Sequence, residues 1–359
     1  MRRLEKYLKD AFVRVLRTGL RTRRPLRRLP PLGLAPKILL LRPGLIGDLV
    51  VSTPVLRALR ARYPEGRLCL LLGTANASVM QGDGNVDRAF VYRKHPLTAW
   101  RLWKTLRAER FDVIVDLIPG TSLTAALVVA SVHARYSVAL GKGTDFVYDV
   151  AVPQLPEGHH IVDLMAELVR PFGMDPEALD LRPYCVLPEF SVAAARRFLD
   201  ARVSPDACLV GVSISARSPS RYWGATRFVG LLETILESHP EVSALLLHTP
   251  SDEHLAQEIR AAVDPSDRVY APRTGRLTDF VAFLALVDLV LTPDTATVHF
   301  ASALGTPVLG LFSARNLRWR PYCVLHRVVE TESPRLSDIP VERVIEAFEE
   351  LYDAVGRKA

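Results

Sequence analysis

The sequence has few of the features that mark secreted, membrane-spanning or zinc-binding proteins. Its four cysteines, Cys69, Cys185, Cys208 and Cys323, lie far apart and form no CxxC pair, so neither a disulfide framework nor a zinc site is expected. No apolar segment followed by a small-residue cleavage site is present near the start, and no stretch approaches ~20 uninterrupted apolar residues. We therefore expect a cytoplasmic protein without a signal peptide or a spanning helix.

Acidic residues are scarce at the start of the chain. Residues 1–30 contain eleven Arg or Lys and two acids, a net charge of +9 in a chain whose total is +7. Leu4, Tyr7, Leu8 and Phe12 recur among these cations at helical spacing, as in a helix on an anionic membrane surface such as the inner face of the cytoplasmic membrane. A solvated basic leader is the alternative. Nucleic-acid binding is a third reading, disfavoured because the rest of the chain is close to neutral and lacks a nucleic-acid-reading motif.

The remainder of the sequence alternates apolar runs with amphipathic segments. This alternation predicts a doubly wound α/β architecture with buried parallel strands. The expected strands lie at 37–42, 67–72, 113–118, 208–214, 242–248, 287–292 and 307–312, and the clearest helices at 54–63, 98–109, 225–237, 252–263 and 276–286.

A break in composition divides this pattern into two halves. Residues 175–190 contain three prolines and show no clear period. We therefore expect two Rossmann-like domains facing a central cleft, with ligands at the carboxyl ends of the strands. The expected parts are a basic amphipathic arm at 1–36, a first domain at 37–180, a second domain at 181–335 and a C-terminal helix at 336–359.

The first predicted strand runs into the turn RPGLIGD, which has the form of a phosphate-binding loop. It is neither a Walker A loop nor a GxGxxG turn, because only Gly44 and Gly47 are present and no Gly-Lys-Ser/Thr follows. Asp48 closes the turn, where its charge would repel a phosphate. The structural alternative is a tight turn in which Asp48 caps the helix that ends near Tyr63, with Thr53 and Pro54 inside that helix or restarting it.

The second half contains two candidate anion-binding segments. The loop SISARSPSRYW offers hydroxyl donors and fixed cations of the kind a diphosphate needs, namely Ser213, Ser215, Arg217, Ser218 and Arg221. Farther on, PDTATVHF predicts a helix whose N-terminus, at 294–297, presents free N–H groups to an anion. The alternatives are that Asp294 and Thr295 only cap this helix and that His299 is a core histidine.

Together these motifs resemble glycosyltransferase family 9. The resemblance rests on R-x-G-x-x-G-D at 42–48, the Ser-rich loop ending in Arg-Tyr-Trp at 221–223, and PDTATVHFASALGTPVLGLF followed by RWRPY, and it covers roughly residues 37–355. The family's best-known members are ADP-heptose:lipopolysaccharide heptosyltransferases. The resemblance implies a GT-B fold and an inverting transferase that uses a nucleotide-sugar donor, here expected to be ADP-heptose, and a lipid-linked anionic glycan acceptor.

The resemblance also implies roles for individual residues. Asp48 matches the family's general base, and Gly44 and Gly47 would make room for the acceptor sugar. Arg221 matches a lysine that contacts the diphosphate. The donor would further contact Ser215, Arg217, Ser218, Asp294, Thr295, Ala296, Thr297 and His299, with Asp252 or Glu253 on the nucleotide ribose. No cofactor and no metal are expected, and the sequence contains no Asp-x-Asp pair to hold a metal on a diphosphate.

Two positions depart from the family pattern. Arg221 replaces lysine, which keeps the charge and adds bidentate geometry. Ala296 replaces glycine, and its methyl group would be costly if the backbone there takes a positive φ or approaches a phosphate closely. The second departure keeps open a catalytically idle relative that binds a nucleotide-sugar or a glycan.

Overall fold

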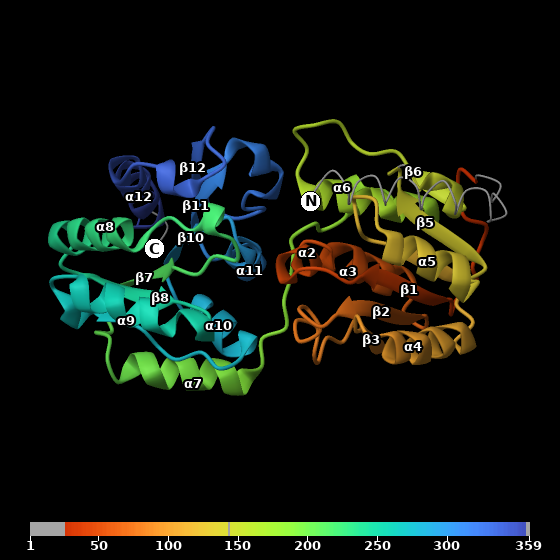
Figure 1. Ribbon diagram of the computed structural model, residues 1–359, viewed down its shortest axis with the longest axis horizontal. Coiled ribbons are helices and arrows are strands. Elements are labelled where there is room, and N and C mark those ends of the chain that lie inside the picture. The colour runs from red at the N-terminus through yellow and green to blue at the C-terminus, as the bar shows by residue number, and fades with distance from the viewer. Residues whose placement is uncertain (1–25, 143, 357–359) are drawn as a thin grey trace. The chain divides into compact units, whose positions relative to one another are not determined.

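The computed structural model describes residues 26–142 and 144–356, and the chain divides into two compact units, Met1–Leu181 and Arg182–Ala359 (Figure 1). Each unit is built on a six-stranded parallel sheet flanked by helices, which confirms the predicted α/β class. The basic segment 1–25 lies outside the described residues. Among the described residues, no helix combines the length and the apolar character needed to cross a bilayer.

The first unit carries strands in the order β3-β2-β1-β4-β5-β6. Because every pair is parallel and the order reverses direction after β1, the sheet has the classic Rossmann arrangement. Its elements are β1 Lys37–Arg42, α2 Ile46–Val50, α3 Thr53–Arg62, β2 Arg67–Gly73, β3 Arg88–Tyr92, α4 Pro96–Ala108, β4 Val113–Asp116, α5 Leu123–Val132, β5 Tyr136–Leu140, β6 Val150–Val152 and α6 Ile161–Ala166.

The second unit repeats this topology with the order β12-β11-β10-β7-β8-β9. Its elements are α7 Glu189–Asp200, β7 Cys208–Ser213, α8 Ala225–Ser238, β8 Val242–Leu247, α9 Glu253–Ala262, β9 Val269–Tyr270, α10 Leu277–Leu284, β10 Leu289–Pro293, α11 Ala296–Leu304, β11 Val308–Ser313, β12 His326–Thr331 and α12 Val341–Gly356. Residues 336–359, expected as a separate C-terminal helix, belong to this unit, where α12 contributes Val344, Phe348 and Leu351 to the core.

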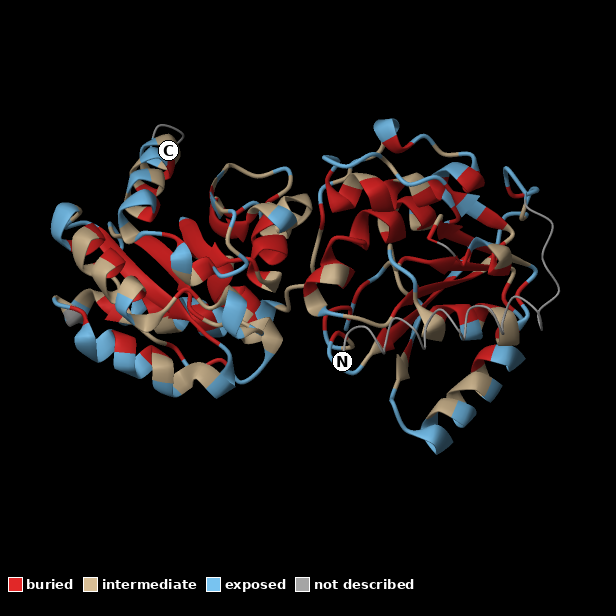
Figure 2. Ribbon diagram, turned by 45° about the horizontal axis from the view of Figure 1, so that its top comes forward, coloured by how far each residue is buried: buried red, intermediate tan, exposed pale blue. Residues whose placement is uncertain are grey.

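The central strands are the predicted apolar runs, and they form because helices cover both faces of a parallel sheet. Every residue of β8 is buried, as is every residue of β1 after Lys37, and the central strands of both units have the colour of buried residues in Figure 2. All seven predicted strands are present. Five strands, β3, β5, β6, β9 and β12, were not predicted.

Residues 26–36, predicted as part of the arm, are packed on the first unit. Leu29 is buried, its backbone N–H donates to the Pro171 carbonyl at 3.1 Å, and the backbone N–H of Leu26 donates to Asp149 at 2.7 Å. The end of the arm is thereby fixed to the sheet edge that carries β6.

Both sheets have a topological switch point, where the strand order reverses and a crevice opens at the carboxyl ends. It lies between β1 and β4 in the first unit and between β7 and β10 in the second. The loop that carries Asp48 follows β1. Ser213 ends β7, and Asp294 directly follows β10. The predicted motifs therefore lie at the two positions where this fold binds ligands.

Candidate active site

Asp48 lies in the third position of the short helix α2, half-buried beside the switch point of the first sheet. Its carboxylate accepts a long hydrogen bond, 3.4 Å, from the backbone N–H of Leu45. This contact is the Asp48 side of a capping box at the start of α2, so Asp48 does cap a short helix, and the helix that ends near Tyr63 begins again at Thr53 with Ser52 as its N-cap residue. The carboxylate is thus held weakly by the backbone and is half-accessible for other contacts.

Gly44 leaves the space that the Asp48 carboxylate occupies. A Cβ atom at position 44 would lie 3.0 Å from Oδ2 of Asp48, closer than ordinary van der Waals contact. Gly44 therefore sets the position of the carboxylate. Gly47 is buried within α2.

Arg42, the last residue of β1, ties the Asp48 loop to the neighbouring strand. Its Nε donates to the Asp48 carbonyl at 2.9 Å and its Nη1 donates to the Leu117 carbonyl at 2.7 Å, so the side chain bridges the switch point. Arg42 is buried, and its Nη2 has no hydrogen-bond partner among the described residues. Burial lowers the pKa of Arg42, while the carboxylates of Asp48 and Asp116 act in the opposite direction.

A second buried charge cluster lies at the end of β4. Asp116 accepts from Lys142 Nζ at 2.5 Å and from the Tyr148 hydroxyl at 2.6 Å. Both side chains of the Asp116–Lys142 pair are at most 1% exposed. Burial lowers the pKa of Lys142, and burial together with Asp116 raises the pKa of Tyr148. The sequence analysis missed this cluster, because Asp116 lies 26 and 32 residues away from its two partners in the sequence.

In the second unit, Arg221 and Asp294 form an ion pair at the switch point. Nη2 of Arg221 lies 3.2 Å from Oδ2 of Asp294, and Nη1 donates to the Asp294 carbonyl at 3.0 Å. Oδ2 of Asp294 also accepts from Asn316 at 3.0 Å. Burial raises the pKa of Asp294, whereas Arg221 and Asn316 oppose this effect. Arg221 is 38% exposed, so this guanidinium can reach a bound anion.

The N-terminus of α11 lies directly beside this pair. Thr295 is the N-cap residue and accepts from the backbone N–H of Thr297 at 3.3 Å. The Thr297 hydroxyl lies 3.1 Å from that of Ser213, which joins the first turn of α11 to the end of β7. The structure thus brings together residues from both predicted anion-binding segments.

Ala296 begins α11 with ordinary helical backbone. Among the described residues, the non-glycine residues with positive φ are Arg110, His133 and Cys323. The methyl group at position 296 therefore causes no backbone strain. That the methyl group of Ala296 hinders the close approach of a phosphate stays a prediction.

Two of the other predicted donor residues, Ser215 and Asp252, form a small hydrogen-bonded group with Thr249. Ser215 accepts from the backbone N–H of Thr249 at 2.8 Å, and the Thr249 hydroxyl donates to Asp252 at 2.7 Å. Glu253 instead pairs with Arg273. Ser218 contacts the Ser220 hydroxyl at 3.0 Å, and Arg217 is exposed on the same loop. Asp252 is therefore joined to the Ser-rich loop through Thr249, whereas Glu253 is turned to a different partner.

His299 is buried in α11, and its ring packs edge-on against Trp319 with centroids 5.8 Å apart. This environment favours the core-histidine alternative. A contact of His299 with the donor stays a prediction.

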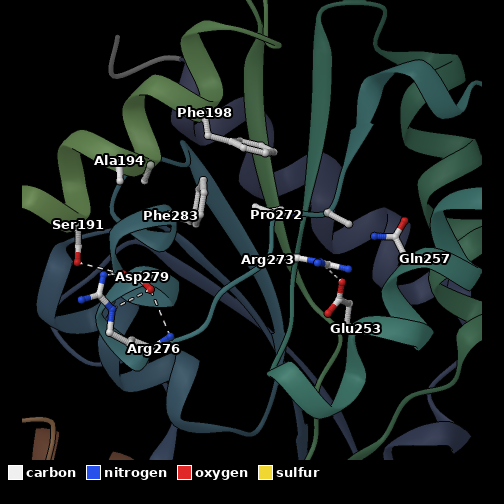
Figure 3. A pocket seen from close by; sticks show the side chains of 12 residues that line it. Ser191, Ala194, Phe198, Glu253, Gln257, Pro272, Arg273, Arg276, Asp279 and Phe283 are labelled. Atoms are coloured by element: carbon white, nitrogen blue, oxygen red, sulfur yellow. Dashed lines mark hydrogen bonds and ion pairs between the residues drawn. The ribbon is translucent and has the colours of Figure 1, made fainter.

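A cavity of about 570 Å³ lies between α7, α10 and the segment that follows β9 (Figure 3). Phe198 and Phe283 meet edge-on inside it, with centroids 5.4 Å apart. Of the predicted site residues it contains only Glu253. The cavity is therefore distinct from the Arg221–Asp294 pair. No group of three or more His, Cys, Asp or Glu side chains in the described part of the chain is arranged to hold a metal ion.

Comparison with known proteins identifies the family. The model of glycosyltransferase family 9 (heptosyltransferase) matches residues 99–344. Lipopolysaccharide heptosyltransferase 3 of Escherichia coli is 25% identical over 292 residues, covering 77% of this chain and 83% of the relative. The lipopolysaccharide core heptosyltransferase OpsX of Haemophilus influenzae is 23% identical over 311 residues, covering 82% of this chain and 84% of the relative.

Solved structures show the same fold. A family 9 glycosyl transferase from Veillonella parvula superposes with a TM-score of 0.77 at 19% identity, covering 89% of this chain and 98% of that one. The ADP-heptose lipopolysaccharide heptosyltransferase II of E. coli superposes with a TM-score of 0.70 at 19% identity, covering 90% and 100%. The fold is GT-B, as the resemblance to glycosyltransferase family 9 implied. Because the family match spans well over half of its length, the chain belongs to glycosyltransferase family 9 and is a glycosyltransferase.

Proposed function

We propose that the enzyme transfers heptose from ADP-heptose to a lipopolysaccharide core or a related lipid-linked anionic glycan. The names of the relatives support this donor and acceptor. The structural observation that carries the proposal is the Arg221–Asp294 pair beside the N-terminus of α11, at the switch point of the second sheet. A partly exposed guanidinium beside the positive end of a helix dipole is an arrangement that favours a bound nucleoside diphosphate.

In this proposal, Arg221 and the first turn of α11 neutralise the diphosphate as it leaves. No metal and no cofactor other than the donor substrate are required, because this cation and the helix dipole meet the developing charge. Ser215 and Asp252, which are joined through Thr249, bind the nucleoside side of the donor.

Asp48 is the proposed general base. Its carboxylate takes the proton of the attacking acceptor hydroxyl while an oxocarbenium-like centre forms at the anomeric carbon, and the sugar inverts its configuration in a single displacement. The half-buried carboxylate makes a long backbone contact to Leu45, which leaves it able to accept a hydrogen bond from an acceptor hydroxyl.

We further propose a cytoplasmic location with contact at the inner face of the membrane, where a lipid-linked acceptor is presented. The charge of residues 1–30 supports it.

The donor is tested first by thermal shift with ADP-heptose and with GDP-, UDP- and dTDP-sugars. A ligand that binds only the folded enzyme, at ~100 times its Kd, adds ~2.7 kcal/mol to the unfolding free energy. ADP-heptose should stabilise the enzyme and the other nucleotides should not. Stabilisation by a different nucleotide-sugar alone would overturn the proposed donor.

The reaction is tested with a truncated lipopolysaccharide acceptor in the presence of EDTA. We expect undiminished transfer, and an anomeric configuration in the product opposite to that of the donor by NMR coupling constants. Retained configuration would contradict the base assigned to Asp48. Loss of activity that Mg²⁺ restores would contradict the metal-free mechanism.

A further inference from the structure

Helix α4 in the first unit is largely uncovered. The sequence predicted an amphipathic helix at 98–109, and the observed α4 begins at Pro96 and buries only Leu106 among its 13 residues. Leu102 and Trp103 are partly buried against the core. Figure 2 shows this helix at the lower right, mainly in the colours of exposed and intermediate residues. One side of α4 packs against the sheet, and no other described residues cover the opposite side.

The uncovered side carries large apolar groups beside cations. Leu97 is 64% exposed and Trp100 is 51% exposed. Arg101 and Lys104 are exposed on the same side, because residues three and four apart share one side of a helix. Lys104 Nζ lies 3.7 Å from the centroid of the Trp100 ring. We name these four residues the outer face of α4.

The charge around this face is of one sign. Residues 93–108 contain five Arg or Lys, namely Arg93, Lys94, Arg101, Lys104 and Arg107, and no acid. The next acid, Glu109, is engaged by Lys37, Arg67 and Arg88. None of the five cations forms an ion pair with a carboxylate of the described residues. The outer face therefore presents uncompensated positive charge around an exposed indole.

We propose that the outer face of α4 docks on the anionic surface of a lipid bilayer. A helix that lies in the interface presents Trp and Leu to the acyl boundary and Lys and Arg to the headgroups, which is the composition found here. A second copy of the chain fits poorly, because it would bring two sets of five cations together. The inference is independent of the proposed donor and acceptor, and it concerns a segment separate from residues 1–30.

The first test measures partition of the full-length enzyme onto vesicles of phosphatidylglycerol and phosphatidylcholine. We compare the parent with Trp100→Ser/Arg101→Gln/Lys104→Gln. Because each cation near an anionic surface contributes ~1 kcal/mol, loss of two should weaken binding roughly 30-fold or more, and 0.5 M salt should shrink the difference. Binding of this variant that equals the parent would overturn the proposal, even if residues 1–30 anchor the enzyme.

Helix α7 supplies a matched control. Phe190 is 57% exposed, with Arg276 over its ring, and Arg196 and Arg197 are exposed on the same helix. Phe190→Ser/Arg196→Gln/Arg197→Gln thus removes an exposed aromatic and two cations elsewhere, and should leave vesicle binding within about threefold of the parent. An equal loss in both triple variants would show a nonspecific charge effect and overturn the proposal.

The second test measures whether the indole of Trp100 enters the acyl region of the bilayer. Vesicles with brominated acyl chains should quench part of the tryptophan emission of the parent, and Trp100→Phe should remove most of that quenching without changing the melting temperature. Quenching unchanged by Trp100→Phe would mean that the indole stays in water. Binding to soluble polyglutamate without binding to vesicles, or dimerisation lost in the α4 triple variant, would assign the face to an acidic protein or a second copy and overturn the proposal.

Discussion

Replacing Asp48 with asparagine should separate catalysis from stability. The carboxylate makes one long backbone contact, 3.4 Å to Leu45, and Ser52 rather than Asp48 precedes α3. Asparagine keeps the size and the accepting oxygen, so we expect the unfolding free energy to change by less than ~0.5 kcal/mol. Turnover should fall ~10²–10⁴-fold, which corresponds to ~2.7–5.4 kcal/mol in activation free energy.

Replacing Gly44 with alanine should displace the Asp48 carboxylate without removing it, and so should perturb the proposed base less than Asp48→Asn does. In Gly44→Ala, the new Cβ would lie 3.0 Å from Oδ2 of Asp48, so the carboxylate must move by a few tenths of an ångström. Turnover should fall several-fold with donor affinity unchanged, because a misplaced base loses rate while the donor site is untouched. Gly84→Ala is the matched control, since its Cβ would meet no atom within 4 Å.

The assay measures three quantities on each variant: melting temperature, donor affinity by calorimetry, and initial rate at saturating donor and acceptor. Near-parental turnover in Asp48→Asn would refute the assignment and make the carboxylate structural. A fall in rate matched by a fall in donor affinity would instead place Asp48 in donor binding.

Three further predictions concern charged residues at the two switch points. Arg221→Ala should weaken ADP binding about tenfold and lower turnover further, whereas Arg221→Lys should retain much of both. If calorimetry and rate measurements gave the alanine variant the ADP affinity and turnover of the parent, Arg221 would be excluded from the anion site. Burial raises the pKa of Asp294 in the folded state, so the stability that this group contributes is fully present below its ordinary pKa and is lost as the pH rises through the raised pKa. In urea unfolding, the parent should therefore lose stability relative to Asp294→Asn from about pH 4 upward. A stability difference that does not change with pH would contradict this. Lys142→Met should lower the unfolding free energy by ~3–5 kcal/mol, because it leaves Asp116 buried without its cation. Lys142→Met/Asp116→Leu should recover part of that free energy. An unchanged denaturant midpoint in the single variant would refute the coupling of the two residues.

The sequence predicted the central strands because those strands are continuous apolar runs, as in β1 and β8. It missed edge strands such as β3 and β12, which have exposed residues and lack such runs. A strand of this kind forms because a neighbour supplies its hydrogen bonds, and this information is absent from its own residues.

The candidate site was predictable to a similar extent. The turn at Asp48 and the helix start at Thr295 have local signatures in glycine spacing and capping residues. The bridge from Arg42 to Leu117 joins residues 75 apart, so it depends on strand order rather than on any motif. The assignment of Ala296 also needed coordinates, because whether a methyl group is strained depends on the local φ.

The contact between Arg221 and Asp294 has a consequence for the kinetics of product release. Because the guanidinium already pairs with a carboxylate, a diphosphate bound at the proposed site would replace one anionic partner with another instead of neutralising a bare cation. When that nucleotide left, Asp294 would pair with Arg221 again, so its departure would expose no unpaired charge. Such a site would bind the ground-state nucleotide less tightly and release the spent donor more readily.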